Sequence, residues 1–169
     1  MNNFYKIFCI VLILLLFNKI SISADGTKDN PFNVLLVPAD GGTEEGTISD
    51  FKPIFNAISL ATNYFFNIIV GQSYSAVVEG ICSGLADFAW FGPVTYLQAK
   101  DKGCVELLAV EVRKGSSVYY SGIFTNNNNL SINNLNDLYG KKVAFGDINS
   151  TSSFVFPMAM LVESGINPI

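Results

Sequence analysis

Asn-Val-Leu-Leu-Val-Pro-Ala, residues 33–39, is an almost unbroken apolar run near the start of the chain. A strand with one face in water would alternate apolar and polar residues, whereas a strand covered by helices on both faces reads as a continuous apolar run. The run therefore predicts a buried strand in a parallel sheet, and hence an α/β protein.

The segments that follow alternate between strand-like and helix-like patterns. Further strands are expected at Phe66–Val70, Leu85–Phe91 and Val105–Val112. Helices are expected after a cap at Thr47, with Pro53 near the first turn, and at Tyr74–Cys82 and Val94–Lys100. Strands that alternate with helices favour βαβ units, in which helices cover both faces of a parallel sheet.

The pattern changes after residue 117. Val118–Thr125 is strand-like and leads into the polar tract Asn126–Asn129, which together look like a crossing between two lobes. Beyond it we expect a short helix at Asn134–Leu138, a strand at Val143–Phe145 and a helix from about Ser150 to Glu163. Pro157 requires that last helix to be kinked or to start late.

The N-terminal residues 1–24 resemble a secretory leader. They contain no acidic residue, carry Lys6 near the front, and run apolar from Ile7 to Phe17. That run fits a signal-peptide core of about 7–15 residues and falls short of the roughly 20 residues that span a bilayer. We expect a cleavable signal peptide and an exported protein; the alternative is an uncleaved membrane anchor, and in both cases the rest of the chain lies outside the cytoplasm.

Composition excludes several classes of function. The formal net charge is −4 and no basic face is visible, so a nucleic-acid partner is not expected. The chain has no histidine, which excludes histidine-based triads and metal sites. Cys82 and Cys104 alone make no zinc site, and no cofactor or metal is expected. In an oxidising compartment these cysteines either pair or remain as two free, buried thiols.

The loop Gly146–Ser153 is the most informative candidate site. Ser150, Thr151 and Ser152 stand where a helix is expected to begin, so hydroxyls and unpaired backbone N–H groups gather at one place. Such a helix start suits an anion, because its dipole and its N–H donors favour negative charge. The loop contains no Lys or Arg, so neutral donors would hold the anion. Helix capping alone explains the hydroxyls about equally well.

Two tyrosines are further candidates. Tyr74 is expected at the start of a helix, and Tyr119 lies in the expected crossing between the lobes. A phenol can donate to an oxyanion while its ring excludes water, although an aromatic ring more commonly belongs to the core.

Several stretches, in order, resemble the substrate-binding proteins of phosphate/phosphite/phosphonate ABC transporters, and the resemblance covers nearly all of residues 33–168. The stretches are residues 72–80 (QSYSAVVEG), 87–93 (DFAWFGP), 131–138 (SINNLNDL), 140–147 (GKKVAFGD) and 149–152 (NSTS).

The resemblance implies a type 2 periplasmic-binding-protein fold, with two α/β lobes that close over a ligand about a hinge. On this basis residues 25–117 form the first lobe, 118–129 the hinge or crossover strand, and 130–169 the start of a second lobe that is incomplete in this chain. The ligand residues that it implies are Tyr74, Tyr119, Ser150, Thr151 and Ser152.

The expected function is capture of phosphate, phosphite or a phosphonate in the periplasm and delivery to an ABC transporter permease, without catalysis. A sensory input module of the same fold is the alternative. A hydrolase or transferase acting on phosphate esters is a third interpretation, and the lack of histidine argues against it.

Overall fold

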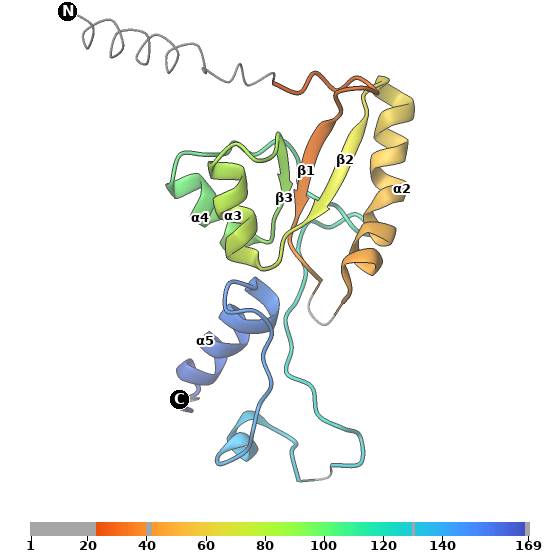
Figure 1. Ribbon diagram of the computed structural model, residues 1–169. Helices are drawn as coiled ribbons and strands as arrows, with labels where there is room; N and C mark the ends of the chain where they lie inside the picture. Colours follow the sequence, from red (N-terminus) through yellow and green to blue (C-terminus); the bar gives the residue numbers. More distant parts are fainter. Residues whose placement is uncertain (1–22, 40–41, 130, 168–169) are drawn as a thin grey trace, which may run out of the picture.

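The structure is a computed structural model that describes residues 23–39, 42–129 and 131–167. Within this part of the chain, β1 (Phe32–Leu36), β2 (Phe66–Val70) and β3 (Phe88–Trp90) form a parallel sheet in the order β2-β1-β3 (Figure 1). β1 pairs with β2 along all 5 of its residues. The predicted parallel sheet is therefore confirmed, with the 33–39 run at its centre.

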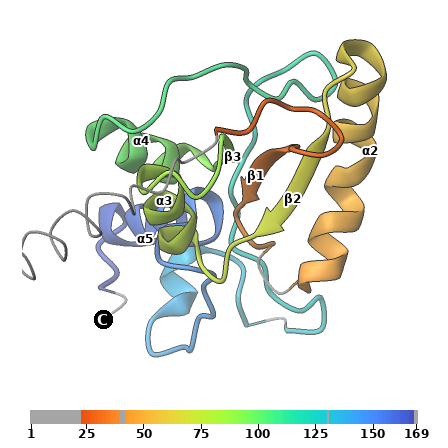
Figure 2. The same ribbon diagram turned by 45° about the horizontal axis from the view of Figure 1, so that its top comes forward.

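Helices cover both faces of this sheet (Figure 2). Val34 and Leu36 of β1 pack toward helix α2 (Glu44–Thr62), where they form a cluster with Phe55. Leu35 packs on the opposite face against Val77 of helix α3 (Tyr74–Cys82). Helix α4 (Pro93–Asp101) packs beside α3. Burial on both faces explains why the strand is apolar at successive positions.

The prediction that Thr47 caps the first helix is wrong, because α2 begins one turn earlier. Thr43 is the N-cap, and its hydroxyl accepts a hydrogen bond from the N–H of Gly46 at 3.0 Å. Thr47 is instead buried inside the helix, where its hydroxyl donates to the Thr43 carbonyl at 3.0 Å. Pro53 accordingly lies inside the helix and not in its first turn.

Several expected strands are shorter than predicted or are not formed. Leu85–Phe91 is reduced to β3, and an isolated bridge between Arg113 and Ser116 is the one pairing recorded within 105–125. The unpaired segments in the described residues are Val105–Val112, Val118–Thr125 and Val143–Phe145. A strand exists only when a neighbouring backbone offers hydrogen bonds, and no described segment lies beside these three as a strand.

The second unit, residues 131–167, is built around a small core of its own. Leu138, Leu161 and Ile166 are buried together, and partly buried side chains from 123–145 pack on them. The elements here are the 3-10 helix η1 (Leu135–Leu138), the π-helical turn η2 (Thr151–Val155) and helix α5 (Phe156–Glu163).

The helix predicted from Ser150 to Glu163 is divided between Val155 and Phe156, so α5 starts late, as Pro157 predicts. Pro157 sits in the first turn of α5 and has no N–H to donate to the Ser153 carbonyl one turn back. That carbonyl accepts instead from the N–H of Gly146 at 3.1 Å. Gly165, at φ 77°, ends the helix in the left-handed conformation that glycine favours.

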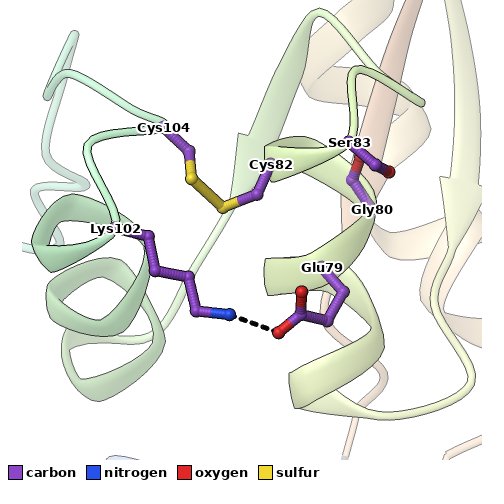
Figure 3. Close-up of a disulfide and its surroundings, with 6 residues drawn as sticks. All are labelled: Glu79, Gly80, Cys82, Ser83, Lys102 and Cys104. Atoms are coloured by element: carbon purple, nitrogen blue, oxygen red, sulfur yellow. Dashed lines mark hydrogen bonds and ion pairs between the residues drawn. A yellow bond between two sulfur atoms is a disulfide. The ribbon is translucent and has the colours of Figure 1, made fainter.

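Cys82 and Cys104 form a disulfide, so the alternative of two free thiols is excluded in this structure (Figure 3). Cys82 is the last residue of α3, and Cys104 follows the end of α4. An ion pair between Glu79 and Lys102 joins the same two helices.

Residues 1–22, which make up nearly all of the predicted leader, lie outside the described residues. Among residues 23–39, 42–129 and 131–167, none of the helices has both the length and the hydrophobicity needed to cross a bilayer.

Candidate functional site

The carboxyl edge of the sheet faces the second unit (Figure 1). Helices α2 and α3 leave neighbouring strands toward opposite faces, so the strand order reverses at β1. Ligands of open α/β sheets bind outside the carboxyl ends of the strands at such a reversal. The first turns of α3 and α4 lie at this edge, close to the segment that contains η2 (Figures 1 and 2).

Ser150 begins the candidate loop and is 3% exposed. Its hydroxyl accepts a hydrogen bond from the N–H of Ser153 at 3.4 Å, so it caps η2 as the capping interpretation expects. Its carbonyl accepts from the N–H groups of Phe154 at 3.2 Å and Val155 at 3.0 Å, which produces the π-helical turn. A hydroxyl that accepts a bond still carries its own proton donor, so capping and anion binding are compatible at Ser150.

Thr151 is 5% exposed and connects the two units. Its Oγ1 accepts a hydrogen bond from the backbone N–H of Val94, in the first turn of α4, at 2.9 Å. Gly92 is the N-cap of α4 and has no side chain that could accept this bond. Thr151 therefore supplies, from the second unit, the capping oxygen that the first unit lacks.

Ser152 is bonded to the segment that precedes the second unit, because its carbonyl accepts a hydrogen bond from the hydroxyl of Ser121. Thr151 and Ser152 are the first two residues of η2, and N–H groups in the first turn of a helix lack acceptors within it. The loop thus presents hydroxyls and amide donors together. π-helical turns of this kind are frequent at functional sites.

The two candidate tyrosines are placed differently. Tyr74 is the first residue of α3, at the carboxyl edge, and is 8% exposed. Tyr119 is 54% exposed and lies two residues before Ser121, which contacts the loop. The structure therefore places Thr151 against α4, with Ser150 and Ser152 beside it in the loop. Tyr74 lies at the same edge of the sheet, and Tyr119 lies on the segment that reaches the loop.

Sequence reasoning missed the contribution of α4. Gln98 Nε2 donates to Asn149 Oδ1 at 2.9 Å, next to the Thr151–Val94 contact. Val94 and Gln98 are separated by one helical turn and therefore share a face. That spacing is visible in the sequence, but nothing in the sequence shows what the face contacts.

The electrostatics of the loop depend on neutral donors and one carboxylate. Asp147 Oδ1 accepts hydrogen bonds from the backbone N–H of Asn149 at 2.8 Å and from its Nδ2 at 3.3 Å. No lysine or arginine lies within residues 146–153. Within the described ranges, no three His, Cys, Asp or Glu side chains are grouped so that they could hold a metal ion.

A parallel sheet with a hydroxyl-rich loop at its carboxyl edge is an arrangement that suits a solute-binding protein. The model of a family of ABC-transporter periplasmic substrate-binding proteins for phosphonate matches residues 42–169. The chain belongs to this family, which is one of binding proteins.

Individual relatives agree with the family. The phosphate-import protein PhnD of Mycolicibacterium smegmatis is 30% identical over 149 residues, which are 86% of this chain and 46% of that protein. A phosphonates-binding periplasmic protein of Escherichia coli is 33% identical over 95 residues, which are 54% of this chain and 28% of that protein. The chain thus spans about half or less of the length of these relatives.

The fold is also found among solved structures. The crystal structure of a binding-protein component of an ABC phosphonate transporter from Pseudomonas aeruginosa superposes with a TM-score of 0.70 at 22% identity. The match covers 82% of this chain and 47% of that one. The predicted periplasmic-binding-protein fold is therefore confirmed over the matched part of this chain.

Proposed function

We propose that this chain is the ligand-capturing part of a periplasmic solute-binding protein that takes up a small phosphorus oxyanion and delivers it to an ABC transporter. Three consecutive hydroxyl residues at the start of η2, two of them at most 5% exposed, are the observation that carries the proposal. The family supports it, since the relatives are named for phosphate import and phosphonate binding.

The donor chemistry of the loop suits a tetrahedral oxyanion. Ser150, Thr151 and Ser152 each offer a hydroxyl proton, and the first turn of η2 adds backbone N–H groups. Hydrogen bonds to a charged ligand are each worth roughly 1.5–3 kcal/mol, so a few of them suffice for micromolar affinity of about −8 kcal/mol. A site without fixed cations also releases its anion readily, as delivery to a transporter requires.

Tyr74 and Tyr119 complete the proposed site from the side of the first unit. In this proposal residues 25–117 form one lobe, 118–129 the crossing and 130–169 the start of the other lobe. Ligand binding then closes the lobes about the crossing, which is how hinged binding proteins gain affinity.

The proposal also holds that the protein does no chemistry on its ligand. No histidine is present, and no metal-binding group of side chains occurs in the described residues. The one carboxylate of the loop, Asp147, accepts two hydrogen bonds from Asn149.

Calorimetric titration of protein purified from the cell envelope tests this function. Phosphate, phosphite, methylphosphonate and 2-aminoethylphosphonate are the ligands, and sulfate is the control of similar shape. Saturable, near-micromolar binding of at least one phosphorus oxyanion is expected, with weaker binding of sulfate. Equal affinity for sulfate, or no binding of any phosphorus oxyanion, would contradict the proposal.

A further inference from the structure

Helix α4 is hydrogen-bonded to the candidate loop at two points on one face. The N–H of Val94, in its first turn, donates to Thr151 Oγ1 at 2.9 Å. One turn further on, Gln98 Nε2 donates to Asn149 Oδ1 at 2.9 Å. Asn149 and Thr151 flank Ser150, so α4 holds the loop on both sides of the residue that caps η2.

The opposite end of α4 is fixed covalently to α3 (Figure 3). The N–H of Cys104 donates to the carbonyl of Ala99, inside α4, at 3.2 Å, which joins Cys104 to the end of the helix. Its sulfur is bonded to Cys82, the last residue of α3. Helix α3 is in turn anchored to the sheet through Val77, which is fully buried.

These contacts form one continuous path from the sheet to the loop. A helix of 9 residues is about 13 Å long and nearly rigid, so a shift at its C-terminal end moves its N-terminal end as well. Because Gly92 provides no capping side chain, the first turn of α4 depends on Thr151 for its cap, and Thr151 depends on α4 for its position.

We propose that Gln98 and the Cys82–Cys104 disulfide are positioning groups for the Asn149–Ser152 loop, acting through α4. The disulfide fixes the helix at one end, and Gln98 transmits that placement to Asn149. The consequence for ligand affinity rests on the proposed function, whereas the effect on the loop itself does not require a ligand.

Hydrogen exchange measured without ligand tests whether α4 positions the Asn149–Ser152 loop. The double variant Cys82→Ser with Cys104→Ser is compared with Glu79→Gln, which removes the neighbouring ion pair between the same two helices and keeps the disulfide. Peptides covering 92–98 and 147–153 should exchange at least about fivefold faster in the double variant, the lower end of ordinary coupling between sites. In Glu79→Gln they should be unchanged. Unchanged exchange at 147–153 in the double variant would overturn the proposal.

Gln98→Met tests the same path without touching the disulfide, which matters if the double variant does not fold. Methionine keeps the length of the side chain and removes its amide donor. We expect faster exchange at 147–153 and binding of inorganic phosphate that is about fivefold or more weaker, with the disulfide intact. Unchanged exchange and unchanged affinity would overturn the role of Gln98.

The two proposals can fail separately. If the unmodified protein binds no phosphorus oxyanion, the proposed function is wrong, and the exchange results still decide whether α4 positions the loop. If the unmodified protein binds phosphate and the loop exchanges alike in all variants, the positioning inference alone is wrong.

Discussion

The hydroxyl of Thr151 caps helix α4 by accepting a hydrogen bond, at 2.9 Å, from the N–H of Val94, which lies 57 residues earlier in the chain. A capping residue normally belongs to the helix that it caps, and here it belongs to the second unit, residues 131–167. The same side chain is proposed to contact the ligand. Capture of the ligand and contact between the units would therefore share one hydroxyl.

Thr151→Val should weaken binding of the phosphorus oxyanion by roughly tenfold to a hundredfold, because one hydrogen bond to a charged ligand is lost. Loss of the cap on α4 should lower the free energy of unfolding by about 1 kcal/mol. Thr151→Ser keeps the hydroxyl and should retain most of the ligand affinity and most of the free energy of unfolding. Calorimetric titration and chemical denaturation measure the two effects. Reduced stability with unchanged affinity would make Thr151 a cap only.

Tyr119→Phe should weaken oxyanion binding several-fold without changing the melting temperature, because its side chain is 54% exposed. Tyr120→Phe is the matched control, since Tyr120 is the adjacent residue and is 91% exposed. Equal effects of the two substitutions would show that neither phenol has a specific role in the site. The assays are calorimetric titration and thermal unfolding.

Replacing both Cys82 and Cys104 by serine should lower the free energy of unfolding by roughly 3 kcal/mol, the chain-entropy value for a cross-link across 22 residues. Denaturant titration under nonreducing conditions measures the loss. Peptide mapping of the protein without reductant should recover the two cysteines in one linked peptide. Two free thiols in that map would contradict the disulfide.

The pKa of the Asp137 carboxyl is lowered by hydrogen bonds from the backbone N–H groups of Asn133 and Asn134. A lowered pKa means that this carboxylate contributes stability above its unfolded pKa, and that the contribution is lost as the pH falls through the folded pKa. Asp137→Asn should therefore lower the free energy of unfolding at neutral pH. It should also make that free energy depend less on pH below about pH 4. NMR titration of Asp137 and unfolding curves across this range are the measurements. A titration midpoint at or above the ordinary aspartate value would contradict these hydrogen bonds.

Residues 25–169 produced as a separate polypeptide should self-associate. Leu108, Tyr120 and Phe124 are 77%, 91% and 92% exposed, and unpaired extended segments that carry such side chains invite further contacts. Leu108→Lys with Phe124→Lys should shift the polypeptide toward monomer. Size-exclusion chromatography with light scattering measures this, and a monomer at high concentration without these substitutions would contradict the prediction.

The sheet and its helices could be read from the sequence because their signals are local. The bounds of α3 and β2 agree with the predicted Tyr74–Cys82 and Phe66–Val70. The cap of α2 was misplaced because Thr43 and Thr47 are one turn apart and both fit a helix start. The strand expected at Val105–Val112 failed because strand formation depends on a distant partner, and apolar composition alone does not supply one.

In the candidate site, too, local features could be predicted from the sequence and contacts between distant residues could not. Local chemistry indicated the hydroxyls of Ser150–Ser152, since helix starts collect such residues for capping and for anions alike. The contacts of Val94 and Gln98 with the loop join residues more than 50 positions apart, which no local pattern encodes. The pairing of Cys82 with Cys104 was left open because spacing alone does not determine whether two cysteines meet.

The disulfide encloses β3 and α4 within one covalent ring. A protease that cuts the backbone between residues 83 and 103 would open this ring without releasing a piece of the protein. The nicked protein would migrate as a single species until a reductant separates its two parts. The helix that carries Val94 and Gln98 would remain attached to α3, so a protein damaged in this way could keep the loop of Thr151 in place.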